Sequence, residues 1–160
     1  MVAGGWLTGG EKGIPLAYRF DPTDESWTRV SDMNKPRFYP TLTHFGTKDF
    51  ANSEIVAKSG KDDMGNDIPN VELYNPTNNV WTDILGAGKE LPYYPGAHVI
   101  SSGQWAGEIF YSVPYSIPDR LAWRFDPQGL GSPNPYWNSV GSARPTNRWR
   151  ASPTLLPLLP

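Results

Sequence analysis

The sequence contains no cysteine among its 160 residues, which excludes disulfide frameworks, cysteine metal ligands and thiol nucleophiles. It has no run of about 20 apolar residues, the length that a membrane-spanning helix needs. The net charge at pH 7 is −2, so the chain lacks the basic surface typical of nucleic-acid binders. Its first ten residues lack the basic and apolar regions of a secretory signal. We therefore expect neither a nucleic acid nor a membrane as a partner.

Glycine and proline are abundant instead, with 16 and 17 copies distributed along the chain. Proline recurs too often for long uninterrupted helices, so these residues indicate turns between many short elements. Aromatic residues make up 13% of the chain and include seven tryptophans. They supply enough large apolar side chains to build a core, which argues against disorder.

One motif occurs three times and consists of an aromatic residue, Asp or Asn, Pro, and a later Trp. The copies are Phe20-Asp21-Pro22 with Trp27, Tyr74-Asn75-Pro76 with Trp81, and Phe125-Asp126-Pro127 with Trp137. The prolines are 54 and 51 residues apart (76 − 22 and 127 − 76), close to the period of about 50 found in kelch repeats. The third copy carries five extra residues, 129–133, before its tryptophan. Because the three tryptophans share one place in the repeat, we predict that they are core residues, with Trp27 and Trp81 largely buried.

A second series of motifs, at 38–40, 93–95 and 151–153, advances with the first. In the middle repeat it predicts strands at 41–45, 54–58, 70–74 and 80–84, and it predicts further strands at 96–100 and 154–158. The Asp-Pro and Asn-Pro pairs are predicted to form the turn between the third and fourth strands. The sequence thus predicts an all-β fold of kelch-type β-propeller blades, about three four-stranded antiparallel sheets with permuted ends. We expect one partial propeller domain over 1–160, with repeats roughly at 1–35, 36–90 and 91–145, and 146–160 opening the next blade.

Five segments carry a more specific resemblance. They are 35–43 (KPRFYPTLT), 61–69 (KDDMGNDIP), 71–76 (VELYNP), 91–95 (LPYYP) and 151–158 (ASPTLLPL). In this order they resemble the blades of glyoxal-oxidase-like proteins of the galactose oxidase family. The resemblance implies a kelch propeller and an extracellular or periplasmic location.

Those oxidases hold one copper ion with two tyrosines and two histidines, and one of the tyrosines is crosslinked to a cysteine. By this resemblance Tyr39 matches the crosslinked tyrosine, but the chain has no cysteine, and the other ligands would belong to segments outside it. The aromatic residue or histidine that stacks over the crosslink would fall near Lys61 or Asp62, and neither fits. We therefore expect no cofactor for this chain, and copper only where the full site is present.

Propellers bind ligands at the end where the connections between and within blades converge. The residues there that combine aromatic rings with guanidinium groups suit a sugar or a small carboxylate. They are Arg37, Tyr39, Tyr93, Tyr94, Arg148, Trp149 and Arg150. The alternative is that these side chains only pack between neighbouring blades. His44 and His98 are expected to be hydrogen-bonded residues within strands rather than metal ligands, and 62–67 an acidic solvated turn rather than a calcium loop.

Three functions remain open from the sequence. The first is a non-catalytic propeller segment that serves as a scaffold or a carbohydrate-type binding surface. The second is a segment of a copper-radical oxidase whose other ligands lie elsewhere. The third is a self-assembling protein, because three blades are too few for a closed ring. Whether the chain is an enzyme stays open, with non-catalytic favoured, and its expected partners are a second copy of itself or the remaining blades of a larger propeller.

Overall fold

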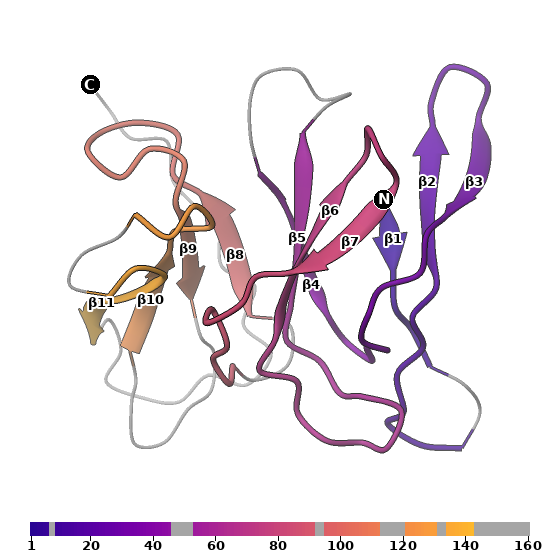
Figure 1. Ribbon diagram of the computed structural model, residues 1–160, viewed down its shortest axis with the longest axis horizontal. Helices are drawn as coiled ribbons and strands as arrows, with labels where there is room; N and C mark the ends of the chain where they lie inside the picture. Colours follow the sequence, from indigo (N-terminus) through magenta and orange to yellow (C-terminus); the bar gives the residue numbers. More distant parts are fainter. Residues whose placement is uncertain (7–8, 46–52, 92–94, 113–120, 131–133, 143–160) are drawn as a thin grey trace. The chain divides into compact units, whose positions relative to one another are not determined.

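The computed structural model describes residues 1–6, 9–45, 53–91, 95–112, 121–130 and 134–142, and within them every regular element is a β-strand (Figure 1). The strands are β1 (Val2–Ala3), β2 (Ala17–Asp21), β3 (Ser26–Val30), β4 (Thr41–Phe45), β5 (Glu54–Lys58), β6 (Val71–Asn75), β7 (Val80–Asp83), β8 (Gly96–Val99), β9 (Ile109–Ser112), β10 (Leu121–Phe125) and β11 (Trp137–Ser142). No helix capable of crossing a membrane occurs in the described residues. The predicted all-β class is confirmed.

The strands form three antiparallel sheets in which each strand pairs with its neighbours in sequence. Their orders are β1-β2-β3, β4-β5-β6-β7 and β8-β9-β10-β11. The chain divides into two compact units, Met1–Tyr94 with the first two sheets and Pro95–Pro160 with the third. The single domain over 1–160 stays a prediction.

The sequence repeat corresponds to a repeated strand pair. In each sheet the aromatic residue of the motif lies directly opposite its tryptophan on the next strand, as Phe20 with Trp27, Tyr74 with Trp81, and Phe125 with Trp137. The ring centroids of these pairs are 5.1, 5.0 and 4.6 Å apart. The five extra residues of the third copy therefore lie in its hairpin connection and leave the aromatic pair unchanged.

The turns of the three motifs also share one hydrogen bond. The side-chain Oδ1 of the Asp or Asn accepts the backbone N–H two residues on, at 2.9 Å in every case: Thr23 to Asp21, Thr77 to Asn75, and Gln128 to Asp126. This bond mimics a backbone turn and explains why Asp and Asn are interchangeable here. The predicted turns are confirmed.

Most predicted strand bounds are confirmed to within one residue. The strands expected at 41–45 and 54–58 match β4 and β5, whereas β6 begins one residue later than expected and β7 and β8 each end one residue earlier. The Ile84 N–H still bonds to the Val71 carbonyl, so pairing persists just beyond β7. The strand predicted at 154–158 lies outside the described residues.

The core of the first unit lies between its two sheets. It consists of Ala3, Ala17, Met33, Ala57, Tyr74 and Trp81, with Met1, Val30, Leu42 and Ile55 packed against them. One face of β4–β7, which carries the Tyr74–Trp81 pair, thus packs on the small side chains of β1–β3.

The predicted burial of the motif tryptophans is right for two copies and wrong for one. Trp81 and Trp137 are buried, but Trp27 is 55% exposed. Side chains alternate between the faces of a strand, so Phe20 and Trp27 lie on the opposite face of their sheet from Ala17 and Val30, which form the core. The sheet β1–β3 covers Trp81, but no described residue covers the face that carries Trp27 in the same way. Trp27 therefore remains exposed to solvent.

Candidate functional site

Three connections of the first unit meet at one end and form a surface that we call the loop platform. It comprises 4–6 and 9–14 between β1 and β2, 37–40 between β3 and β4, and 59–69 between β5 and β6 (lower end of the first unit in Figure 1). These are the types of connection that the sequence predicted to converge.

Backbone hydrogen bonds join the three connections. Arg37 donates its N–H to the Ile14 carbonyl at 3.0 Å, and its own carbonyl accepts the Gly5 N–H at 2.9 Å. Phe38 and Lys61 exchange two bonds of 2.8 and 2.9 Å. Because each loop is held by its neighbours, the platform is ordered by main-chain bonds rather than by side chains alone.

Two glycines permit this close approach. A Cβ on Gly13 would lie 2.4 Å from the Lys61 carbonyl oxygen, and one on Gly60 would lie 2.5 Å from that of Phe38. Gly60 also has a φ of +96°, in the left-handed region that glycine adopts without steric cost. A side chain at either position would force the loops apart.

Aromatic rings give the platform its chemical character. Phe38 is buried, and the Tyr39 ring stacks on it with centroids 3.7 Å apart. The Trp6 ring lies 6.2 Å from that of Phe38 on a tilted plane. Trp6 is 58% exposed and Tyr39 is 40% exposed. A buried ring therefore supports two rings that face solvent.

Tyr39 adopts a left-handed backbone conformation with a φ of 58°. A non-glycine residue in this region costs of order 1 kcal/mol or more, and such residues concentrate at binding sites. Here the conformation places the ring against Phe38 while leaving it open to solvent.

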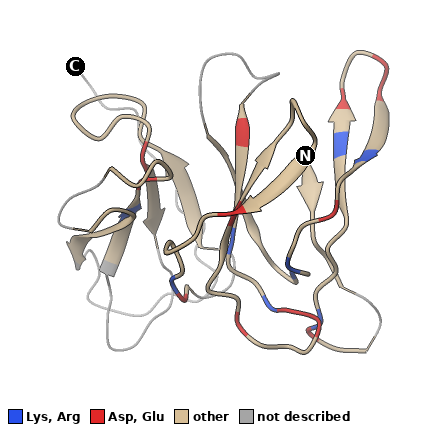
Figure 2. Cartoon of the chain, viewed as in Figure 1, with Lys and Arg blue, Asp and Glu red and all other residues tan. Residues whose placement is uncertain are grey.

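Charged groups of both signs lie on the same loops (Figure 2). Lys61 Nζ pairs with Asp67 Oδ1 at 3.2 Å and donates to the Gly65 carbonyl at 3.0 Å. Burial acts to raise the pKa of Asp62, but bonds from Asn66, Met64 and Gly65 outweigh it and hold that pKa below its usual value. The carboxylate accepts the N–H groups of Met64 and Asn66 at 2.8 Å, as in the solvated turn predicted for 62–67.

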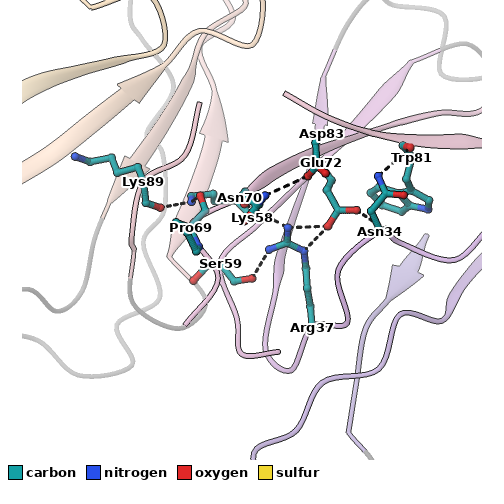
Figure 3. A network of polar contacts seen from close by, with 10 residues as sticks. All are labelled: Asn34, Arg37, Lys58, Ser59, Pro69, Asn70, Glu72, Trp81, Asp83 and Lys89. Carbon is teal, nitrogen blue, oxygen red and sulfur yellow. Dashed lines mark hydrogen bonds and ion pairs between the residues drawn. The ribbon is translucent and has the colours of Figure 1, made fainter. Parts of the chain in front are cut away.

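Arg37, a predicted ligand contact, lies buried beneath the platform (Figure 3). Its Nε and Nη2 donate to Glu72 Oε1 at 3.0 and 2.8 Å, and its Nη1 donates to the Ser59 carbonyl at 2.8 Å. Glu72 Oε2 accepts the Asn34 N–H at 2.6 Å. The guanidinium therefore ties the loop platform to β6, while the ring of Tyr39, the other described candidate, is open to solvent.

Lys58 belongs to the same network and was not singled out from the sequence. It is fully buried at the end of β5, and its Nζ donates to the carbonyls of Pro69, at 2.5 Å, and Lys89. Burial, reinforced by the nearby charges of Arg37 and Lys89, lowers the pKa of Lys58 from 10.5 to about 7, while Glu90 acts in the opposite direction.

The remaining predicted site residues are distributed as follows. Tyr93, Tyr94, Arg148, Trp149 and Arg150 lie outside the described residues. His44 and His98 lie on β4 and β8, as predicted for strand residues. Among the described residues, the buried His98 Nε2 has no hydrogen-bond partner, contrary to the hydrogen bond expected there.

The copper site implied by the resemblance does not fit the donors that are described. Such a site needs two tyrosines and two histidines together. Within the described ranges no three His, Cys, Asp or Glu side chains gather where they could hold a metal ion, and no cysteine exists to crosslink with Tyr39. We derive no chemistry through copper.

Comparison with known proteins adds no family. No protein-family model matches the chain, and no curated protein matches it. Its functional assignment therefore depends on the loop platform. Trp6 is the platform residue that sequence reasoning missed, and its signal was an aromatic residue directly after the Gly4-Gly5 pair.

Proposed function

We propose that the chain is a non-catalytic segment of a kelch-type β-propeller and that its loop platform binds carbohydrate. Three consecutive antiparallel sheets, one of three strands and two of four, support the propeller part of the proposal. The binding part depends on one observation, the exposed rings of Trp6 and Tyr39, each of which lies against the buried Phe38.

Exposed aromatic rings suit sugars because the C–H face of a pyranose is apolar and lies flat on a ring, while the hydroxyl groups around its edge need polar partners. Lys61 and Asp67, on the neighbouring loop, supply a donor and an acceptor of this kind. The main-chain bonds between the loops fix the rings before binding, which reduces the entropy lost when a ligand is held.

The proposal predicts that the protein is retarded during native electrophoresis through gels containing a neutral polysaccharide, tested with β-glucan, xyloglucan and galactomannan. We expect Trp6→Ala and Tyr39→Ala each to weaken retardation, with affinity reduced roughly 2- to 10-fold for one lost stacking contact. Trp27→Ala is the matched control, since Trp27 is 55% exposed and Trp6 58% exposed but Trp27 lies on β3, away from the loops.

Loss of retardation in the Trp27→Ala control to the same extent would show non-specific adhesion through exposed indoles. If none of the three polysaccharides, nor a printed glycan array, retains the wild-type protein, the carbohydrate proposal is wrong and the scaffold role is left.

A further inference from the structure

The sheet β1-β2-β3 carries an apolar surface on the side that faces away from the core, here called the aromatic face. It consists of Val2, Tyr18, Phe20 and Trp27, which are between 36% and 55% exposed. Val2 pairs with Tyr18, and Phe20 pairs with Trp27, so the four side chains lie on one face, at whose β3 edge Arg29 lies opposite Tyr18. A contiguous exposed patch of this kind typically marks an interaction surface.

The second sheet shows which kind of surface packs against such a face. Its own aromatic pair, Tyr74 and Trp81, is buried against the back face of β1–β3, where Ala3 and Ala17 provide small side chains. The Trp81 Nε1–H donates to the Ser31 carbonyl at 2.8 Å. Ser31 N–H in turn donates to Asn79 Oδ1 at 2.9 Å. An aromatic face is thus covered by the back face of a neighbouring sheet.

The third sheet has a back face of its own that is only partly covered. Phe110 lies opposite Arg124 on this face, whereas Tyr111 and Phe125 belong to the buried aromatic side. A groove of about 600 Å³ runs over it, lined by Ile100, Phe110, Val140 and the loop 101–105. Val140 is 40% exposed and Trp105 is 43% exposed.

Arg124, which lines this groove, has a hydrogen-bond donor that lacks an acceptor within the described part of the chain. Its Nη1 bonds to both carboxylate oxygens of Glu108 at 3.0 Å, and its guanidinium lies 4.1 Å from the Trp105 ring centre. Its buried Nε has no hydrogen-bond partner among the described residues. A surface that covered the groove and offered a backbone carbonyl would satisfy this donor, as the Ser31 carbonyl satisfies Trp81.

We propose that the aromatic face of one copy of the chain docks on the back face of β8–β11 in a second copy. The pairing is head-to-tail, because the two surfaces differ and each copy carries both. It repeats between chains the contact that the first unit already makes between its own two sheets. The inference depends on the sheets alone and is independent of the loop platform.

The test uses the full chain in sedimentation velocity across its accessible concentration range. We expect the wild type to associate. Trp27→Lys, which places a charge on the aromatic face, and Val140→Lys, which places one in the groove, should each raise the dissociation constant roughly tenfold or more. Trp6→Lys is the matched control and should associate as the wild type does. All three altered side chains are exposed, so circular dichroism should show all variants folded.

Mixing the two interface variants tests the head-to-tail arrangement. An equimolar mixture of Trp27→Lys and Val140→Lys should associate more strongly than either alone, because each supplies the intact surface that the other lacks. A wild type that stays monomeric at every concentration would overturn the proposal. So would association that Trp27→Lys abolishes and Val140→Lys leaves unchanged, because that result would mean two aromatic faces meeting each other.

Discussion

Arg37 and Glu72 are both fully buried and pair at 2.8 Å. Taking two charges out of water costs several kcal/mol for each ion, and the pair is tolerated only where the remaining donors and acceptors are satisfied. Ser59 and Asn70 carbonyls accept from the guanidinium, and the Asn34 N–H donates to the carboxylate. The groups of this network therefore depend on one another. Removing either Arg37 or Glu72 leaves the other charge buried without its counterpart.

We predict that Arg37→Met lowers the free energy of unfolding by about 3–5 kcal/mol, because it leaves Glu72 charged and unpaired in the interior. Urea denaturation measures this loss. The double variant Arg37→Met, Glu72→Met should lose less than the sum of the single variants. Arg29→Met is the control, since its pair with Asp32 is exposed and its loss should leave stability nearly unchanged. Equal losses in Arg37→Met and Arg29→Met would contradict the buried network.

Lys58 makes stability depend on pH. Its pKa is about 7 in the folded protein against 10.5 ordinarily, so between these values the unfolded chain binds a proton that the folded chain does not. The free energy of unfolding therefore rises as the pH rises from about 7 toward 10.5, by up to about 1.4 kcal/mol per pH unit. Below about pH 7 Lys58 is protonated in both states, and its contribution does not change with pH.

We expect the stability difference between wild type and Lys58→Met to grow in favour of the wild type from about pH 7 to about pH 9. Urea denaturation at each pH measures it, and Lys35→Met, at an exposed position, controls for the loss of one charge. A difference that stays constant over this range would show that Lys58 keeps its proton in the folded state.

Equivalent strands of the repeat differ in what covers them, so Trp81 is buried whereas Trp27, at the same position of the repeat, is exposed. Trp81→Ala should cost about 3–5 kcal/mol, because it removes a buried ring and its bond to Ser31. Trp27→Ala should cost less than about 1 kcal/mol in the dilute chain, because the ring is already largely in solvent. Thermal melts of the two variants compare them directly, and equal shifts would show that the aromatic face is covered in solution.

The difference between Trp81 and Trp27 shows which features of the strands could be predicted from the sequence. Turn chemistry and strand pairing are local, so the Asp-Pro and Asn-Pro motifs predicted the hairpins and the aromatic pairs. The exposure of Trp27 depends on which sheet lies against which face, and a repeat pattern does not carry that information. Arg37 was predicted to contact a ligand or to pack between blades. Arginine is rarely fully buried without a partner, and the sequence did not reveal its partner Glu72, which lies 35 residues away. Trp6 was missed because its Gly-rich loop matches no other repeat.

At the scale of the whole molecule, the two proposals depend on different surfaces. Sugar binding depends on loops at one end of the first unit, whereas association depends on the outward face of β1–β3 in one copy and the groove over β8–β11 in another. Trp6 and Trp27 therefore serve as controls for each other: one variant should lose sugar binding and the other association. In all three sheets the strands pair in sequence order, and each sheet carries one aromatic pair of the motif. The repeat therefore defines the architecture of both units, while the loops between strands carry the individual chemistry.

The hairpin between β10 and β11 also suggests how the protein can be engineered. The motif tryptophan follows its aromatic partner by 7 residues in two sheets (27 − 20 and 81 − 74) and by 12 in the third (137 − 125), yet the rings meet in the same way. The longer connection thus leaves the aromatic pair beneath it unchanged, and each doubling of a flexible loop costs only about 0.6 kcal/mol. An epitope tag or a fluorescent reporter inserted at the corresponding tip, between Thr77 and Asn78, would be displayed at the surface of a sheet that folds as before.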